Sequence, residues 1–207
     1  MIEQPNNIFQ SIDIRVEGGY QRVEGVVADD KFYGILSDRW HADLRTKPLK
    51  VTERIRFERF IESLRGPRIL ANIVDVTNRR DADLYWPFLA NGNLTVGLAA
   101  NAGSEFLTIG GVGGANGTEI AQPGALFSID NADGTRSMHK VATPATVTAG
   151  ISQLTIWPRL RRNIAVGEII DITTPSVSLR LRNIATRTPN TLRDETVVFS
   201  CQFREVK

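Results

Sequence analysis

An amphipathic helix predicted over residues 52–65 constrains the fold most strongly, because nearly all other apolar residues alternate as they do in strands. Four of its residues recur at the 3.6-residue helical period and fall on one face: Phe57, Phe60, Ile61 and Leu64. A lone helix among strands can bury such a face only against a sheet. The sequence therefore predicts a mainly β fold in which one helix packs on a sheet.

The two ends of this helix carry their own signals. Thr52 is the predicted N-cap, because its hydroxyl can accept a hydrogen bond from a free backbone N–H of the first turn. Glu53 places negative charge near the positive end of the helix dipole. Gly66 and Pro67 predict the stop, since glycine adopts the left-handed conformation easily and proline cannot continue a helix.

A shift in composition separates the middle of the chain from its flanks. Residues 92–175 hold 11 charged side chains in 84 residues, whereas the preceding 91 residues hold 28. Short apolar runs separated by glycine-rich turns are typical of a small barrel or sandwich. The expected strands are Leu94–Ala99, Glu105–Ile109, Leu126–Asp130, Ser137–Val141, Gln153–Trp157 and Glu168–Thr173. We also expect a short helical turn within Arg159–Val166.

Alternating strands on both sides of this middle stretch predict a second β domain. The first 90 residues contain too few strands to close a sheet around the helix, and the last 30 add two alternating runs, with a polar loop expected over Asn183–Glu195. We predict a β-sandwich or split-barrel domain with one α-helix, built from residues 1–90 plus 176–207. An OB-like small β-barrel is inserted in it at residues 91–175.

The sequence offers no convincing reaction centre. His41, His139 and Cys201 are the only residues of their types. We expect each histidine to lie on the surface or to have a packing role, and Cys201, which shares an apolar parity, to lie in the core. The run 130–134 lacks the spacing of a calcium loop and predicts a hairpin turn. The glycine-rich run 110–114 matches neither a dinucleotide fingerprint nor a phosphate-binding loop. We therefore expect no enzyme activity, no cofactor and no metal.

A small basic cluster is the one candidate contact on the barrel surface. Arg159, Arg161 and Arg162 follow Trp157, and basic side chains beside an aromatic are typical of single-strand nucleic-acid sites. The middle stretch as a whole carries 5 basic and 6 acidic residues, so a solvated loop or a subunit contact is the favoured interpretation. No apolar run approaches the length of a membrane span.

Exposed aromatic side chains would indicate a carbohydrate-binding module instead. Phe106, Phe127 and Trp157 are predicted from their parity to lie in the barrel core, which disfavours that function.

Several packing and turn motifs in the second half of the chain form a characteristic series. They are GALFSI at 124–129, MHKV at 138–141, LTIWPRLR at 154–161 and VSLRL at 177–181. In this order they resemble a run found in bacteriophage tail proteins, and the whole chain is similar to the distal tail proteins of long-flexible-tailed phages (siphophages). In that family a β domain with one helix is interrupted by an OB-like barrel.

The resemblance implies a structural virion protein. It implies a hexameric ring of identical subunits that joins the tail tube to the host-recognition tip, formed in the host cytoplasm and located at the virion tail tip. The implied partners are other copies of the chain, the tail tube protein and baseplate hub or tail-tip proteins, with fibre or receptor-binding proteins as further partners. It implies no membrane and no specific nucleic acid. The alternative is an OB-type binding module for single-stranded nucleic acid or carbohydrate.

Four arginines near the C-terminus are the candidate subunit interface. Arg180 and Arg182 lie on a predicted strand, and Arg187 and Arg193 lie in the polar loop that follows it. We expect these side chains to meet acidic groups of the next subunit, where paired charges set register more than affinity.

Overall fold

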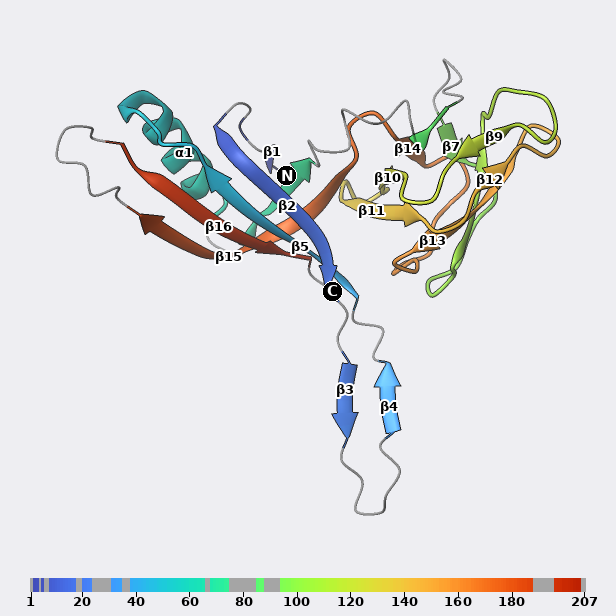
Figure 1. Cartoon of the computed structure of the whole chain (residues 1–207), viewed down its shortest axis with the longest axis horizontal. Helices are drawn as coiled ribbons and strands as arrows, with labels where there is room; N and C mark the ends of the chain where they lie inside the picture. The colour runs from blue at the N-terminus through green and yellow to red at the C-terminus, as the bar shows by residue number, and fades with distance from the viewer. Residues whose placement is uncertain are drawn as a thin grey trace. The chain divides into compact units, whose positions relative to one another are not determined.

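The computed structural model confirms a mainly β chain with one helix and a small closed barrel (Figure 1). It describes residues 2–3, 5, 8–17, 20–23, 31–34, 38–65, 68–74, 85–87, 94–187 and 196–205. The elements in chain order are β1 (Ile2–Glu3), β2 (Phe9–Glu17), β3 (Tyr20–Val23), β4 (Lys31–Gly34), β5 (Arg39–Thr46), α1 (Val51–Ser63), β6 (Leu70–Val74), β7 (Leu94–Val96), β8 (Phe106–Gly110), β9 (Glu119–Ala121), β10 (Leu126–Asp130), β11 (Arg136–Val141), β12 (Ala145–Thr146), β13 (Ser152–Trp157), β14 (Ile169–Asp171), β15 (Ser176–Arg187) and β16 (Val198–Arg204).

The chain divides into two compact units. One comprises Met1–Pro5 and Ile69–Ser178 and contains the barrel; we call it the barrel unit. The other comprises Asn6–Arg68 and Leu179–Lys207 and contains α1; we call it the helix unit. The strand β15 begins in the first unit and continues into the second. The domain limits predicted at residues 90 and 176 stay a prediction.

The strands outside the barrel form a six-stranded sheet and a separate hairpin. The sheet has the order β1-β6-β15-β16-β5-β2, in which β1 pairs with β6 in parallel and β15, β16, β5 and β2 pair in an antiparallel manner. The strands β3 and β4 form a two-stranded antiparallel sheet of their own. In the six-stranded sheet, side chains on β2 and β5 alternate between a face turned to the core and a face turned to solvent.

The helix packs its predicted apolar face within the helix unit. Phe57 is 1% exposed, and its ring centroid lies 4.7 Å from that of Phe199 on β16 and 6.2 Å from that of Phe9 on β2. Phe60 and Leu64 are also buried, and burying each such side chain contributes about 1.5–3 kcal/mol. The helical periodicity thus identified the residues that anchor α1 on the sheet.

The helix begins at Val51, and its N-cap lies two residues before the predicted one. The N-cap is Lys50, and Thr52 lies inside the first turn, so the predicted cap is wrong. Glu53 explains the shift, because its Oε2 accepts a hydrogen bond from the Lys50 N–H at 3.4 Å and so reaches back over the turn. The helix ends at Ser63 rather than at residue 65. Gly66 and Pro67 lie outside the described residues.

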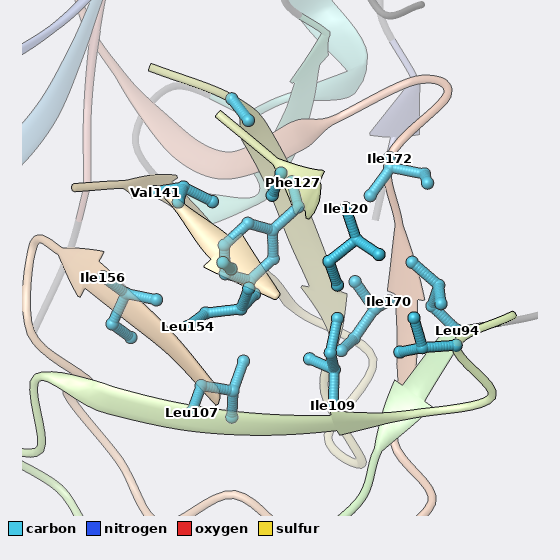
Figure 2. Packing of buried hydrophobic residues seen from close by; sticks show 14 of the residues in the cluster. Leu94, Leu107, Ile109, Ile120, Phe127, Val141, Leu154, Ile156, Ile170 and Ile172 are labelled. Carbon is cyan, nitrogen blue, oxygen red and sulfur yellow. The ribbon is translucent and has the colours of Figure 1, made fainter. Parts of the chain in front are cut away.

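The barrel closes through antiparallel pairs in the order β10-β11-β13-β8-β7-β14, with β14 also paired to β10. All of the strands expected in the middle stretch are present in it, with ends shifted by a few residues. Inward-facing side chains of these strands fill the interior (Figure 2). Phe127, Leu107 and Leu154 are each 0% exposed, so the barrel is a packed core and not a channel.

Three local expectations need correction. The short strands β9 and β12, which pair with each other, had no clear alternation and were not predicted. Arg159–Val166 forms no helical turn, because its backbone bonds to a neighbouring loop: the Leu160 N–H donates to Ser104 O and the Ile164 N–H to Ala100 O. Asn183–Glu195 is not all loop, since β15 runs to Arg187 and pairs with β16.

Candidate functional site

The solvent side of the sheet in the helix unit collects basic residues from four strands. The pairing places Arg15 opposite His41, His41 opposite Arg204, and Arg204 opposite Arg180, which makes one row across β2, β5, β16 and β15. We call this surface the arginine face. It contains Arg15, Arg39, Arg45, Arg180, Arg182 and Arg204, with His41 between them.

Strand alternation on β5 explains why these side chains share a surface. Trp40, Ala42 and Leu44 are buried, so the residues between them must face the other way. Arg39 and Arg45 are therefore on the same side of the sheet as His41. The pairs across the neighbouring strands repeat this order, because their register is continuous through the row.

A β-bulge on β15 adds Arg182 to this surface. Leu181 pairs with Phe203, and Asn183 pairs with the preceding residue Gln202, so Arg182 is the extra residue of the bulge. Arg180, Arg182 and Asn183 are all exposed. Bulges commonly re-aim a side chain at functional positions, and this one places two arginines close together along a single strand.

The acidic groups on the arginine face are concentrated around one arginine. Arg15 forms ion pairs with Asp43 at 2.6 Å, with Asp13 at 2.8 Å and with Glu17 at 3.2 Å. Hydrogen bonding to Asp43 raises the pKa of Arg15 further, with Asp13 contributing less. Each of these pairs is well exposed and contributes little to stability by itself.

Among the residues that the structure describes, the other arginines of the face have no such partner. Within the described part of the chain, no carboxylate lies within the 4.0 Å of an ion pair from Arg39, Arg45, Arg180, Arg182 or Arg204. Arg180 and Arg204 face each other directly, and like charges in this position destabilise a sheet. Six arginines against three carboxylates leave a formal excess of three positive charges.

His41 reports the electrostatic character of this surface. Its side chain is buried, and its Nε2 lies 3.1 Å from Glu17 Oε2. Burial lowers the pKa of His41, and the positive charges of Arg204, Arg15 and Arg182 lower it further against the opposing effect of Glu17. His41 is consequently neutral at pH 7, and the positive character of the face comes from its arginines.

The four predicted interface residues fall into two groups. Arg180 and Arg182 belong to the arginine face. Arg187 ends β15, where its backbone pairs with that of Val198, and Arg193 lies outside the described residues. Arg15, Arg39, Arg45 and Arg204 were not identified from the sequence, although each lies next to a buried or half-buried apolar residue on its strand.

The basic cluster predicted on the barrel surface is largely compensated by carboxylates. Arg159 forms an ion pair with Glu105. Arg162 contacts Asp133 at 3.3 Å and Glu168 at 3.4 Å. Arg161 is exposed. These pairs remove most of the excess positive charge that a nucleic-acid backbone would require, and the role of the cluster stays a prediction.

Two aromatic residues assigned to the barrel core are in fact on its surface. Phe106 is 51% exposed and Trp157 is 39% exposed, whereas Phe127 is buried as expected. The sequence contained the signal, because Phe106 shares its parity with Thr108, and Trp157 shares its parity with Thr155. The inward positions of β8 and β13 are occupied by aliphatic side chains instead.

The remaining candidate groups are consistent with packing. His139 is buried, stacks on Phe127 with ring centroids 5.7 Å apart, and has its Nδ1 2.8 Å from Pro158 O. Burial lowers the pKa of His139 to about 4 and raises that of Cys201 to about 12. The loop after Asp130 is a hairpin turn, as predicted: the Gly134 N–H donates to Asn131 O at 2.8 Å.

The described ranges contain neither a metal site nor a membrane-spanning helix. No group of three or more His, Cys, Asp or Glu side chains is placed there to hold a metal ion. No helix there has the length and apolar character needed to cross a membrane. Comparison with known proteins adds no assignment: no protein-family model matches the sequence, and no curated protein matches it.

Proposed function

We propose that this protein is a distal tail protein of a long-tailed bacteriophage, six copies of which form a ring between the tail tube and the host-recognition tip. The observation that carries the proposal is the arginine face of the helix unit, a basic surface on which five arginines have no carboxylate partner among the described residues. The order of the elements supports it, because a helix-backed sheet and a small closed barrel share this chain as the family resemblance implies.

Arg15, His41, Arg204 and Arg180 form one row across the arginine face. Arg180 and Arg204 repel each other in the isolated chain. An acidic surface laid over the row would offset that repulsion and convert it into charge-assisted hydrogen bonds. Since a ring requires two different patches that meet head to tail, the arginine face supplies one of them and an acidic patch of a neighbour supplies the other.

The proposed partners are those that the family resemblance implies. Other copies of the chain complete the ring, the tail tube protein lies on one side, and baseplate hub or tail-tip proteins lie on the other, with fibre or receptor-binding proteins attached around it. Each contact between subunits should bury at least about 1,000 Å². The protein acts as a connector in the virion tail tip and performs no catalysis.

Gold-labelled antibody against this chain tests the proposal on intact virions. The label should appear only where the tail tube ends, next to the host-recognition structures. A label on the capsid, or one distributed along the whole tube, would exclude a distal tail protein.

The alternative function, an OB-type binding module, is favoured by one observation, the exposure of Phe106 and Trp157 on the barrel. A binding barrel and a ring subunit are compatible in one chain, because the exposed aromatics and the arginine face belong to different units.

A further inference from the structure

The aromatic pair on the barrel surface has a defined geometry. The strands β8 and β13 are antiparallel neighbours, and Thr155 lies directly opposite Phe106. Trp157 is two residues further along β13, so it lies on the same face and diagonal to Phe106. Diagonal neighbours of this kind have backbones about 7–8 Å apart, within reach of each other's large side chains. We call Phe106, Thr155 and Trp157, with Lys140 opposite Trp157, the aromatic strip.

The aromatic strip is exposed because the barrel has no room for it. Leu107, Leu154 and Ile156 occupy the inward positions of the same two strands and point into the packed interior (Figure 2). A neighbouring hydroxyl also holds Phe106 in place: Ser104 Oγ accepts a hydrogen bond from the Phe106 N–H at 3.0 Å and donates one to Phe106 O at 2.8 Å. The strip is thus a surface on rigid strands.

The polar groups beside the aromatic rings are hydrogen-bonding and nearly neutral. Thr155 lies opposite Phe106 on the strand that carries Trp157, and the exposed Gln153 precedes it on the same face of β13. Glu105 and Arg159, at the Trp157 end, form an ion pair and so cancel each other's charge. Lys140 is the one formal charge within the strip itself.

This combination selects among possible ligands. Single-stranded nucleic acid requires aromatic rings within a positively charged groove that follows the backbone, and the strip lacks such a groove among the described residues. A sugar ring presents a flat C–H face, which the negative face of an aromatic ring attracts, and hydroxyls at its edge, which Thr155 and Gln153 can bond. Strand faces of small OB-type barrels bind oligosaccharides as well as oligonucleotides.

We propose that the aromatic strip of the barrel is a binding surface for neutral oligosaccharides. Trp157 and Phe106 stack on successive or alternate sugar rings, and the polar side chains between them bond the hydroxyls. The proposal does not depend on ring formation or on any role in a virion.

Trp157 can serve as a fluorescent probe of the aromatic strip. Trp40 and Trp86 are each 3% exposed, whereas Trp157 is 39% exposed, so acrylamide should quench chiefly the fluorescence of Trp157. We would titrate the full-length chain with cellohexaose, maltohexaose and chitohexaose, and in parallel with a dodecamer of thymidylate. At least one saccharide should protect Trp157 from acrylamide with a Kd of about 1 mM or tighter.

Single substitutions test whether saccharide binding depends on the aromatic strip or on another part of the barrel surface. Phe106→Ala leaves the tryptophan probe intact and should weaken saccharide binding about tenfold, which corresponds to about 1.4 kcal/mol. Trp157→Ala should have a similar effect, measured by calorimetry. Ile169→Ala is the matched control, because Ile169 is 50% exposed on β14 and lies outside the strip. Thermal melting of each variant confirms that it is folded.

The outcomes are distinguishable. Saccharide protection of Trp157 that Phe106→Ala weakens and Ile169→Ala leaves unchanged would establish the site. No binding of any of the three saccharides at about 10 mM, beyond the weakest affinities of interest, would overturn it. Binding that Phe106→Ala and Ile169→Ala affect equally would also overturn it. Thymidylate binding lost in Phe106→Ala, without saccharide binding, would identify a nucleic-acid surface in its place.

Discussion

The barrel and the sheet of the helix unit differ in how they treat the side of their strands that faces away from the core. Both bury one side of their strands in an apolar core, as Leu154 is buried in the barrel and Phe57 against the sheet. The barrel closes on itself, and its charged groups are mostly paired, as Arg159 is with Glu105. The sheet leaves one face open, where five arginines have no carboxylate partner among the described residues.

This difference indicates that the arginines without a carboxylate partner identify a surface on which a partner protein could bind. Like charges directly opposite each other on a strand pair are destabilising. Arg180 and Arg204 are such a pair, on strands whose other face is well packed. The packed face serves the stability of the chain, and the other face carries the arginines that we propose to be an assembly surface.

Core substitutions should give the largest effects and should show whether the two cores are comparable. Phe57→Ala should lower the free energy of unfolding by about 3–5 kcal/mol, because it empties the contact with Phe9 and Phe199. Leu154→Ala should cost about 2–5 kcal/mol in the barrel. Urea unfolding measures both, and Ile55→Ala, which alters a residue 43% exposed on the same helix, is the control. A loss for Phe57→Ala no larger than for Ile55→Ala would remove α1 from the core.

Acidification should give the second-largest effect, a loss of barrel stability that depends on His139. The pKa of buried His139 is about 4 in the folded barrel and about 6.5 in an unfolded chain, so the unfolded state binds the proton more readily. The stability from neutral His139 is present above pH 6.5 and is lost as pH falls towards 4, by about 3 kcal/mol in total. Burial also lowers the pKa of His41, so its contribution has the same sign.

Unfolding measured between pH 7 and pH 4 tests this prediction. His139→Gln removes the titrating ring and should flatten the pH dependence of barrel unfolding, whereas His41→Gln should leave barrel unfolding unchanged. A wild-type barrel whose stability is constant over this range would contradict the assignment of a buried neutral imidazole.

Removal of one charge from the arginine face should give the smallest effect on the free chain. Arg180→Gln relieves the repulsion with Arg204 and should raise the free energy of unfolding by up to about 0.5 kcal/mol. Arg56→Gln on the exposed side of α1 is the control and should not be stabilising. The same Arg180→Gln chain should assemble less well, and a variant that is destabilised on its own would show that Arg180 has a partner within the chain.

The extent to which the sequence predicted these features depends on how local each one is. Turn residues and alternation located the main barrel strands, and helical periodicity located Phe57, Phe60 and Leu64, because both signals lie within a few residues. The arginine face depends on register between β2 and β16, which are far apart in the chain, and on the bulge at Arg182. Neither is encoded in a local pattern, so only two of its arginines were identified.

The exposure of Phe106 and Trp157 shows a different limit of prediction from sequence. Phe106 and Trp157 were assigned to the core because the parity of each was interpreted as the apolar, inward-facing one. Their strands, however, already supply aliphatic side chains such as Leu107 and Ile156 at the inward parity. When both parities of a short strand carry apolar residues, the identity of the polar neighbours decides which side faces solvent.

A cryo-electron microscopy reconstruction of the tail end of virions that carry this chain is the strongest test of the proposed assembly. We expect six copies around the tail axis, with Arg180, Arg182 and Arg204 of each copy buried against carboxylates of a neighbouring protein. A reconstruction in which the copies form the ring but the arginine face remains in solvent would contradict the proposed interface. A tail end that lacks this chain would contradict the function itself.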